Sequence, residues 1–224
     1  MVRRFNNCIR LRDLRELVDY AAEKYNVKPA FKEIGPERQI IEHNYNQLKF
    51  DIAALGTKLL ADGLEGKHFA LIGESTYNYV LSYLSVANGA GVIVPIDKEL
   101  TTDDMVRLIL KSDAEIIFFS DCCAPFIADI LAQAPNIITA VNIGNAKPNC
   151  SYLSLNNLMD DGKKLLQEGD TRYTGMTLDV DKNCSILFTS GTTGVNKGVM
   201  LCQRNLATAV YSALSLFVVP DTSF

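Results

Sequence analysis

The chain has 224 residues, enough for one large or two small domains at about 150 residues each. Hydrophobic residues make up 48% and charged residues 21%, a composition that excludes an intrinsically disordered chain. The formal net charge of −4 leaves no basic excess for binding a phosphate backbone, so we expect no nucleic-acid partner.

The first predicted elements are a helix, an extended stretch and a second helix. Apolar residues recur at three- and four-residue steps over 12–25, which predicts a helix that ends before Pro29. Residues 31–41 have the pattern of an extended stretch. Asn44 and Gln47 stand in capping-box-like positions, and the periodic leucines and isoleucine after them predict a helix that stops near Gly63.

Strands then alternate with helices. Short apolar runs without polar alternation, as in strands covered on both faces, occur at 69–72, 92–94, 115–119, 137–141 and 185–188. Helix signals fill 76–88, 101–111, 121–133 and about 155–167, with Thr101 and Asp104 as a capping box and Pro125 in a first turn. Residues 145–149 and 169–181 are predicted connectors, and a last helix carries Leu206 and Leu214. This order predicts an α/β fold, a parallel sheet with helices on both faces.

The N-terminal segment is basic but lacks the apolar core of a secretory signal. The longest apolar stretch, 206–220, is interrupted by hydroxyl residues and falls short of the roughly 20 residues that span a bilayer. We therefore expect a soluble, cytoplasmic protein with no transmembrane segment. Its six cysteines include no C-x-x-C pair and it has only two histidines, so we expect free thiols and no zinc site.

The segment that carries chemistry is Thr189–Gly198. It combines three glycines, four hydroxyl side chains and Lys197, so bare backbone N–H groups, short donors and one mobile cation can surround a polyphosphate. The spacing differs from the G-x-x-x-x-G-K-[ST] phosphate loop, and a dinucleotide fingerprint is absent. The same composition also occurs in ordinary turns, which is the competing interpretation.

The complete string T-S-G-T-T-G-x-x-K-G-V resembles the phosphate-binding signature of the AMP-forming acyl-CoA synthetase and adenylate-forming enzyme superfamily. Residues 88–97, N-G-A-G-V-I-V-P-I-D, and 44–48, N-Y-N-Q-L, resemble two further segments of that family, so the three matches cover the chain. Residues 73–77 through 97–100 look most like bacterial long-chain fatty-acid–CoA ligases. Two positions depart from the family pattern: Asn196 stands where proline is usual, and Gln203 where histidine often precedes the next helix.

The resemblance implies that residues 1–224 are the N-terminal part of the large N-terminal domain of such an enzyme, with the rest of that domain and the C-terminal domain absent. The intact protein would use ATP and magnesium to activate a carboxylic acid, expected to be a fatty acid, as an acyl-adenylate and would then transfer the acyl group to coenzyme A. The residues that would bind ATP are Thr189, Ser190, Gly191, Thr192, Thr193, Gly194 and Lys197, with the Thr189 hydroxyl as a candidate magnesium ligand. No catalytic residue is assigned within the chain, and we expect the chain alone to be inactive.

Two other classes of function remain open, a non-catalytic nucleotide- or phosphate-binding module and a structural interaction domain. The remaining polar residues favour structural roles. We expect His43 and His68 to be structural or solvated, and Asp103 and Asp104 to serve a helix start. Cys122 and Cys123 fit either packing at a helix start or redox chemistry. We expect the tyrosines to pack against the sheet; they are Tyr77, Tyr79 and Tyr83.

Overall fold

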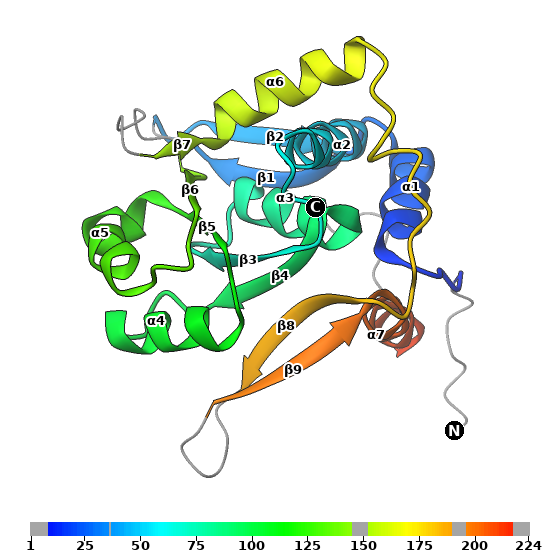
Figure 1. Ribbon diagram of the computed structural model, residues 1–224. Coiled ribbons are helices and arrows are strands. Elements are labelled where there is room, and N and C mark those ends of the chain that lie inside the picture. The colour runs from blue at the N-terminus through cyan, green and yellow to red at the C-terminus, as the bar shows by residue number, and fades with distance from the viewer. Residues whose placement is uncertain (1–8, 36, 145–151, 190–195, 217–224) are drawn as a thin grey trace.

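The computed structural model describes residues 9–35, 37–144, 152–189 and 196–216. Most of these residues belong to an α/β arrangement built on one large sheet (Figure 1). The sheet has seven strands in the order β7-β6-β5-β3-β4-β8-β9. Its strands are β3 (Lys67–Ile72), β4 (Gly91–Ile96), β5 (Ile116–Phe119), β6 (Thr139–Asn142), β7 (Leu153–Ser154), β8 (Asn183–Thr189) and β9 (Lys197–Cys202).

All neighbouring strands of this sheet are parallel except β8 and β9, which are antiparallel. The predicted parallel sheet is therefore confirmed, with one correction at its edge. Only residues 190–196 separate β8 from β9, too few for the crossover that a parallel pair requires, so the two strands pair in opposite directions. No apolar run in the sequence predicts β9.

Helices cover both faces of the sheet, as predicted. One hydrophobic core lies beneath α1, α2, α3 and α6, and a second lies beneath α4 and α5. The helices are α1 (Leu14–Tyr25), α2 (Tyr45–Ala61), α3 (Tyr77–Ser85), α4 (Thr102–Lys111), α5 (Ala124–Gln133), α6 (Leu155–Gln167) and α7 (Gln203–Leu216), with a π-helical turn η1 (Val86–Ala90) and a 3-10 turn η2 (Asp121–Cys123). None of the helices in the described ranges has the length and apolar character that crossing a membrane requires.

The predicted helix starts are confirmed by their caps. The Asn44 side chain accepts a hydrogen bond from the Gln47 backbone N–H at 2.8 Å, and the Thr101 hydroxyl accepts one from Asp104 N–H at 3.2 Å. Each bond satisfies a backbone donor that has no partner within the first helical turn. Pro125 lies in the first turn of α5, where its missing N–H costs nothing.

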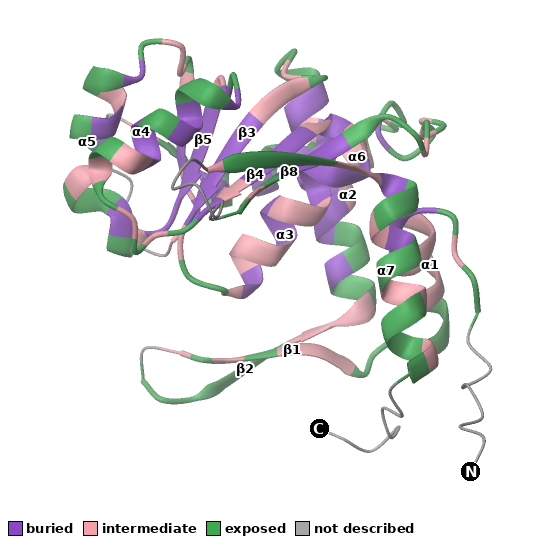
Figure 2. Cartoon of the chain, turned by 90° about the horizontal axis from the view of Figure 1, so that it is seen from below, coloured by how far each residue is buried: buried purple, intermediate pink, exposed green. Residues whose placement is uncertain are grey.

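Two segments differ from the sequence prediction in detail. The extended stretch at 31–41 is a separate antiparallel hairpin of β1 (Pro29–Ile34) and β2 (Ile40–Asn44), which projects from the body (Figure 2). The helix predicted over 76–88 ends as an α-helix at Ser85 and continues as η1. The connector 169–181 has no helix or strand but buries Tyr173, and the connector 145–149 lies outside the described residues.

Candidate phosphate site

The predicted phosphate segment connects β8 to β9. Thr189 is the last residue of β8, Lys197 is the first of β9, and the two are register partners across the antiparallel pair. Opposite residues of such a pair have Cα atoms about 4.5–5.5 Å apart. The structure thus brings together two of the predicted site residues. The other five, Ser190, Gly191, Thr192, Thr193 and Gly194, lie outside the described residues.

Both placed side chains are available to a ligand. Thr189 and Lys197 are exposed, and within the described part of the chain the Lys197 ammonium has no hydrogen-bond or ion-pair partner. A compact ammonium with three free donors can meet the charge of a phosphate group.

A second lysine lies at the same end of the hairpin. The Lys111 ammonium, in the last turn of α4, donates to the Asn196 carbonyl oxygen at 2.5 Å. Asn196 directly precedes Lys197, so the contact links α4 to the start of β9. Lys111 is not predictable from the loop pattern, because it lies 85 positions away in the sequence.

β9 ends at Cys202, and the next residue, Gln203, is buried at the start of α7. Its side-chain oxygen accepts from the Leu14 N–H at 3.0 Å, and its amide nitrogen donates to the Ala87 carbonyl at 2.5 Å. The side chain therefore joins α7, α1 and η1 and uses both a donor and an acceptor. Gln203, which stands where the family pattern often has histidine, therefore has a buried partner for its side-chain oxygen and one for its amide nitrogen.

The turn η1 overlaps the start of the second resembling segment, residues 88–97, and offers carbonyls to distant side chains. The Ser85 carbonyl, just before η1, accepts from the Tyr173 hydroxyl at 2.8 Å. The Asn88 carbonyl accepts from Arg15 at 2.5 Å, and Arg15 also donates to the Met176 carbonyl at 2.7 Å. Together with Gln203, which donates to the Ala87 carbonyl, these side chains tie the turn and the residue before it to three remote segments, α1, the connector 169–181 and α7.

Glycine is required where β4 begins. A Cβ at Gly91 would lie 2.2 Å from the Lys67 carbonyl oxygen of β3, and backbone atoms cannot move aside as a flexible side chain can. The glycine of the N-G-A-G-V segment at this position therefore serves strand packing, and nothing here ties it to a ligand.

The two histidines have structural surroundings. His43 stacks on Tyr77, with ring centroids 3.7 Å apart, and its Nε2 lies 3.1 Å from a Glu33 carboxylate oxygen. The Tyr77 hydroxyl donates to buried Asp51 at 2.8 Å. Burial, followed by the neighbouring Asp51 charge, raises the pKa of Tyr77. His68 Nδ1 lies 2.6 Å from the Ser112 carbonyl oxygen.

The remaining tyrosines and acidic residues also match their predicted roles. Tyr79 and Tyr83 pack against the core beneath α3. Asp104 bonds to the Thr101 hydroxyl and to Arg107 at the start of α4, as expected for a helix start. Among the residues that the structure describes, no group of three or more His, Cys, Asp or Glu side chains could hold a metal ion.

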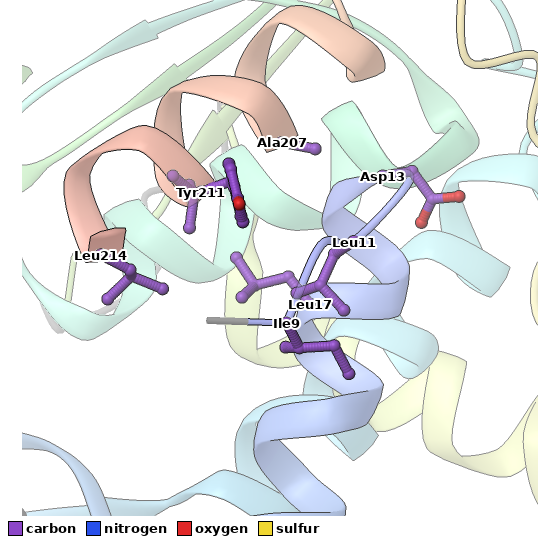
Figure 3. A pocket seen from close by; sticks show the side chains of 8 residues that line it. Ile9, Leu11, Asp13, Leu17, Ala207, Tyr211 and Leu214 are labelled. Carbon is purple, nitrogen blue, oxygen red and sulfur yellow. The ribbon is translucent and has the colours of Figure 1, made fainter. Parts of the chain in front are cut away.

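A groove between α1 and α7 is apolar and unsuited to phosphate chemistry (Figure 3). Its one acidic residue, Asp13, caps α1 by accepting from the Glu16 N–H at 2.8 Å. The lining residues are Ile9, Leu11, Asp13, Leu17, Ala207, Val210, Tyr211 and Leu214. The candidate site is therefore the β8–β9 hairpin.

Residues 18–222 match the family described as AMP-binding enzyme. The chain belongs to this family. Among similar curated proteins is a crotonobetaine/carnitine–CoA ligase of Citrobacter koseri, 28% identical over 204 residues that make up 89% of this chain and 38% of the relative. Another is a 4-hydroxybenzoate–CoA/benzoate–CoA ligase of Rhodopseudomonas palustris, 29% identical, with coverage of 85% and 34%.

Solved structures of AMP-binding enzymes and related proteins share the fold. A long-chain-fatty-acid–CoA ligase of Archaeoglobus fulgidus superposes with a TM-score of 0.75 at 19% identity and covers 96% of this chain and 41% of its own. The adenylation domain of a carboxylate reductase from Mycobacterium chelonae gives 0.74 at 16% identity, covering 90% and 36%. The chain spans less than half the length of the curated relatives it matches.

Proposed function

We propose that this chain is the N-terminal part of an ATP-dependent acid–CoA ligase and supplies its polyphosphate-binding hairpin. The observation that carries the proposal is the pairing of Thr189 with Lys197 at the two ends of the segment that resembles the family's phosphate-binding signature. Membership in the AMP-binding enzyme family supports it. Residues 1–224 would then be one portion of the larger adenylate-forming domain.

In the proposed reaction a carboxylate oxygen attacks the α-phosphorus of ATP. The bond from that phosphorus to the bridging oxygen breaks, pyrophosphate leaves, and the acyl-adenylate then passes its acyl group to coenzyme A. Lys197 and the hydroxyl and backbone donors of 189–194 would hold the β- and γ-phosphates and stabilise the charge on the leaving pyrophosphate. These groups position and neutralise the phosphates without forming covalent bonds to them.

Magnesium fits the residues present. The exposed Thr189 hydroxyl is a hard oxygen donor, and Mg²⁺ in nucleotide sites commonly takes few protein oxygens besides phosphates and water. The ion would neutralise charge on the polyphosphate. Thr189 is its candidate protein ligand.

We propose a fatty acid as the carboxylic acid and the cytoplasm as the location. Residues 73–77 and 97–100 support the first assignment through their likeness to bacterial long-chain fatty-acid–CoA ligases. A medium-chain fatty-acid–CoA ligase of Escherichia coli is among the relatives, at 26% identity, although other relatives are named for carnitine and benzoate.

A titration of MgATP and of pyrophosphate into the chain tests the phosphate site. We expect binding no tighter than about millimolar, or about −4 kcal/mol, because a loop rich in glycine and hydroxyl residues loses much entropy when it orders. Lys197→Ala should abolish this binding and leave the fold intact. Lys182→Ala, which removes another exposed lysine just before β8, should bind like the parent chain.

Calorimetry measures the affinities, and circular dichroism verifies folding. Micromolar ATP affinity, or equal binding by Lys197→Ala and Lys182→Ala, would show that the binding energy lies elsewhere. A second candidate function is a phosphate-binding module without catalysis, which the exposed Thr189 and Lys197 would serve equally well. It predicts the same Lys197 effect, but no adenylate formation when the chain is part of its longer protein.

A further inference from the structure

Two adjacent thiols lie just after the carboxyl end of β5. Cys122 and Cys123 belong to η2, which leads into α5 (Figure 1). Their sulfur atoms are 3.6 Å apart. Cys122 is exposed and Cys123 is buried. Packing therefore accounts for Cys123 but not for Cys122, and the proposed ligase reaction uses neither.

The structure holds this pair in place before any ligand arrives. The Cys123 thiol donates to the Ile72 carbonyl of β3 at 3.7 Å, and Cys122 Sγ lies 3.0 Å from the Ser120 hydroxyl. Ser120 in turn occupies the space over Gly73, where a Cβ would lie 2.6 Å from the serine oxygen. Because these neighbours order both sulfurs in advance, a ligand that needs both would lose little entropy on binding.

The spacing disfavours a disulfide within the pair. An S–S bond is about 2.05 Å long and usually joins residues whose Cα atoms are about 4.4–6.8 Å apart, whereas adjacent Cα atoms are about 3.8 Å apart. A single thiophilic atom bound to both sulfurs fits better. A zinc–thiolate bond, for example, is about 2.3 Å long, and two such bonds at a tetrahedral angle separate the sulfurs by about 3.8 Å; a narrower angle brings them closer together.

We propose that Cys122 and Cys123 form a bidentate site for trivalent organoarsenicals, which bind pairs of thiols. In the reaction of R–As=O with the two thiols, two As–S bonds form and the two S–H protons leave with the oxide oxygen as water. Arsenic and sulfur keep their oxidation states, so no oxidant or reductant is needed. A site with fewer than three protein ligands suits this chemistry, because the organic group fills the third position on arsenic.

The two thiols react in order. The exposed Cys122 attacks first, and Cys123 then closes the ring as an intramolecular step. Burial, followed by the neighbouring Cys122, raises the pKa of Cys123 to about 12, so Cys123 enters as a neutral thiol.

Phenylarsine oxide tests the site. The chain is treated with one equivalent, challenged with excess 2-mercaptoethanol or with the dithiol 2,3-dimercaptopropanol, and analysed by intact-mass and peptide mass spectrometry. A bidentate adduct should survive the monothiol and be lost to the dithiol, because the second As–S bond forms at high effective concentration. We expect the surviving adduct on the peptide that contains residues 122 and 123.

Cys122→Ser and Cys123→Ser should each lower adduct retention by about a hundredfold or more. Cys202→Ser, which removes another thiol that is not fully buried, is the matched control and should retain the adduct. Because Cys122 is exposed, Cys122→Ser is expected to fold, which circular dichroism verifies, so the test does not depend on the buried position. The proposal is overturned if the monothiol strips the parent adduct, if Cys122→Ser keeps it, or if diamide closes a disulfide within the pair.

Discussion

At the scale of single residues, the fold depends on a few buried polar groups that each have a specific partner. Asp51 is 5% exposed and accepts from the Tyr77 hydroxyl at 2.8 Å and from the Gln47 side chain at 2.7 Å. The Tyr77 bond connects α2 to the first turn of α3, and the Gln47 bond lies within α2. A buried carboxylate without such donors would be costly.

Tyr77→Phe should lower the free energy of unfolding by about 1–3 kcal/mol, because it removes a donor from Asp51 and leaves the ring in place. Tyr79→Phe is the matched control, since within the described residues the Tyr79 hydroxyl has no hydrogen-bond partner; it should change stability by less than about 0.5 kcal/mol. Urea denaturation of both variants measures the difference. Equal losses would show that the Tyr77–Asp51 bond contributes nothing specific.

Gln203 provides a second prediction at this scale. Gln203→Leu keeps much of the side-chain volume but leaves the Leu14 N–H and the Ala87 carbonyl without their buried partner. We expect a loss of about 2 kcal/mol or more in unfolding free energy. Gln133→Leu, at the exposed end of α5, should cost far less. A Gln203→Leu protein as stable as the parent in thermal or urea unfolding would contradict this assignment.

At the scale of elements, helices α2 and α6 pack closely against each other at Gly162. A Cβ at Gly162 of α6 would lie 2.1 Å from the Ala54 carbonyl oxygen of α2. Replacing a helical glycine by alanine normally stabilises a helix by about 1 kcal/mol. Here the obstacle is backbone, so the two helices would have to move apart.

Gly162→Ala should therefore destabilise the chain by about 1–3 kcal/mol, opposite in sign to helix propensity. Asn157→Ala, at an exposed position of the same helix, should be neutral or stabilising by a few tenths of a kcal/mol. Chemical denaturation of the two variants compares them directly. A gain in stability for Gly162→Ala would mean that the helices tolerate the added methyl group.

Some of the helices and strands could be predicted from the sequence, and others could not. The parallel strands and their helices followed from apolar runs and caps, because strands covered on both faces need apolar residues throughout. β9 was not predicted because Val199 and Met200 are exposed, so the strand lacks the run of buried apolar residues that marks the other strands. The hairpin β1–β2 likewise exposes Ile34 and Ile40. Such strands are held by backbone pairing, which side-chain periodicity does not report.

At the scale of the whole molecule, the candidate site was predictable only where its chemistry is local. The segment Thr189–Gly198 is contiguous, so its glycines, hydroxyls and lysine could be recognised together. The contacts of Lys111 with Asn196 and of Gln203 with Leu14 and Ala87 join residues far apart in sequence. These contacts depend on the position of the β8–β9 hairpin at the edge of the sheet, which no local sequence pattern predicts.

The 224-residue chain alone is expected to lack adenylation activity. Phosphoryl chemistry of this kind depends on several charge-stabilising groups that act together, and removing some of them costs far more than their separate contributions suggest. The chain offers Lys197 and the hairpin donors but spans only 38% of the carnitine–CoA ligase relative. We therefore expect no pyrophosphate release above the protein-free rate when MgATP and a panel of fatty acids are supplied. The Escherichia coli medium-chain fatty-acid–CoA ligase, assayed in parallel, verifies that the assay detects turnover, and release by the chain that depends on Lys197 would show that its own residues suffice for adenylation.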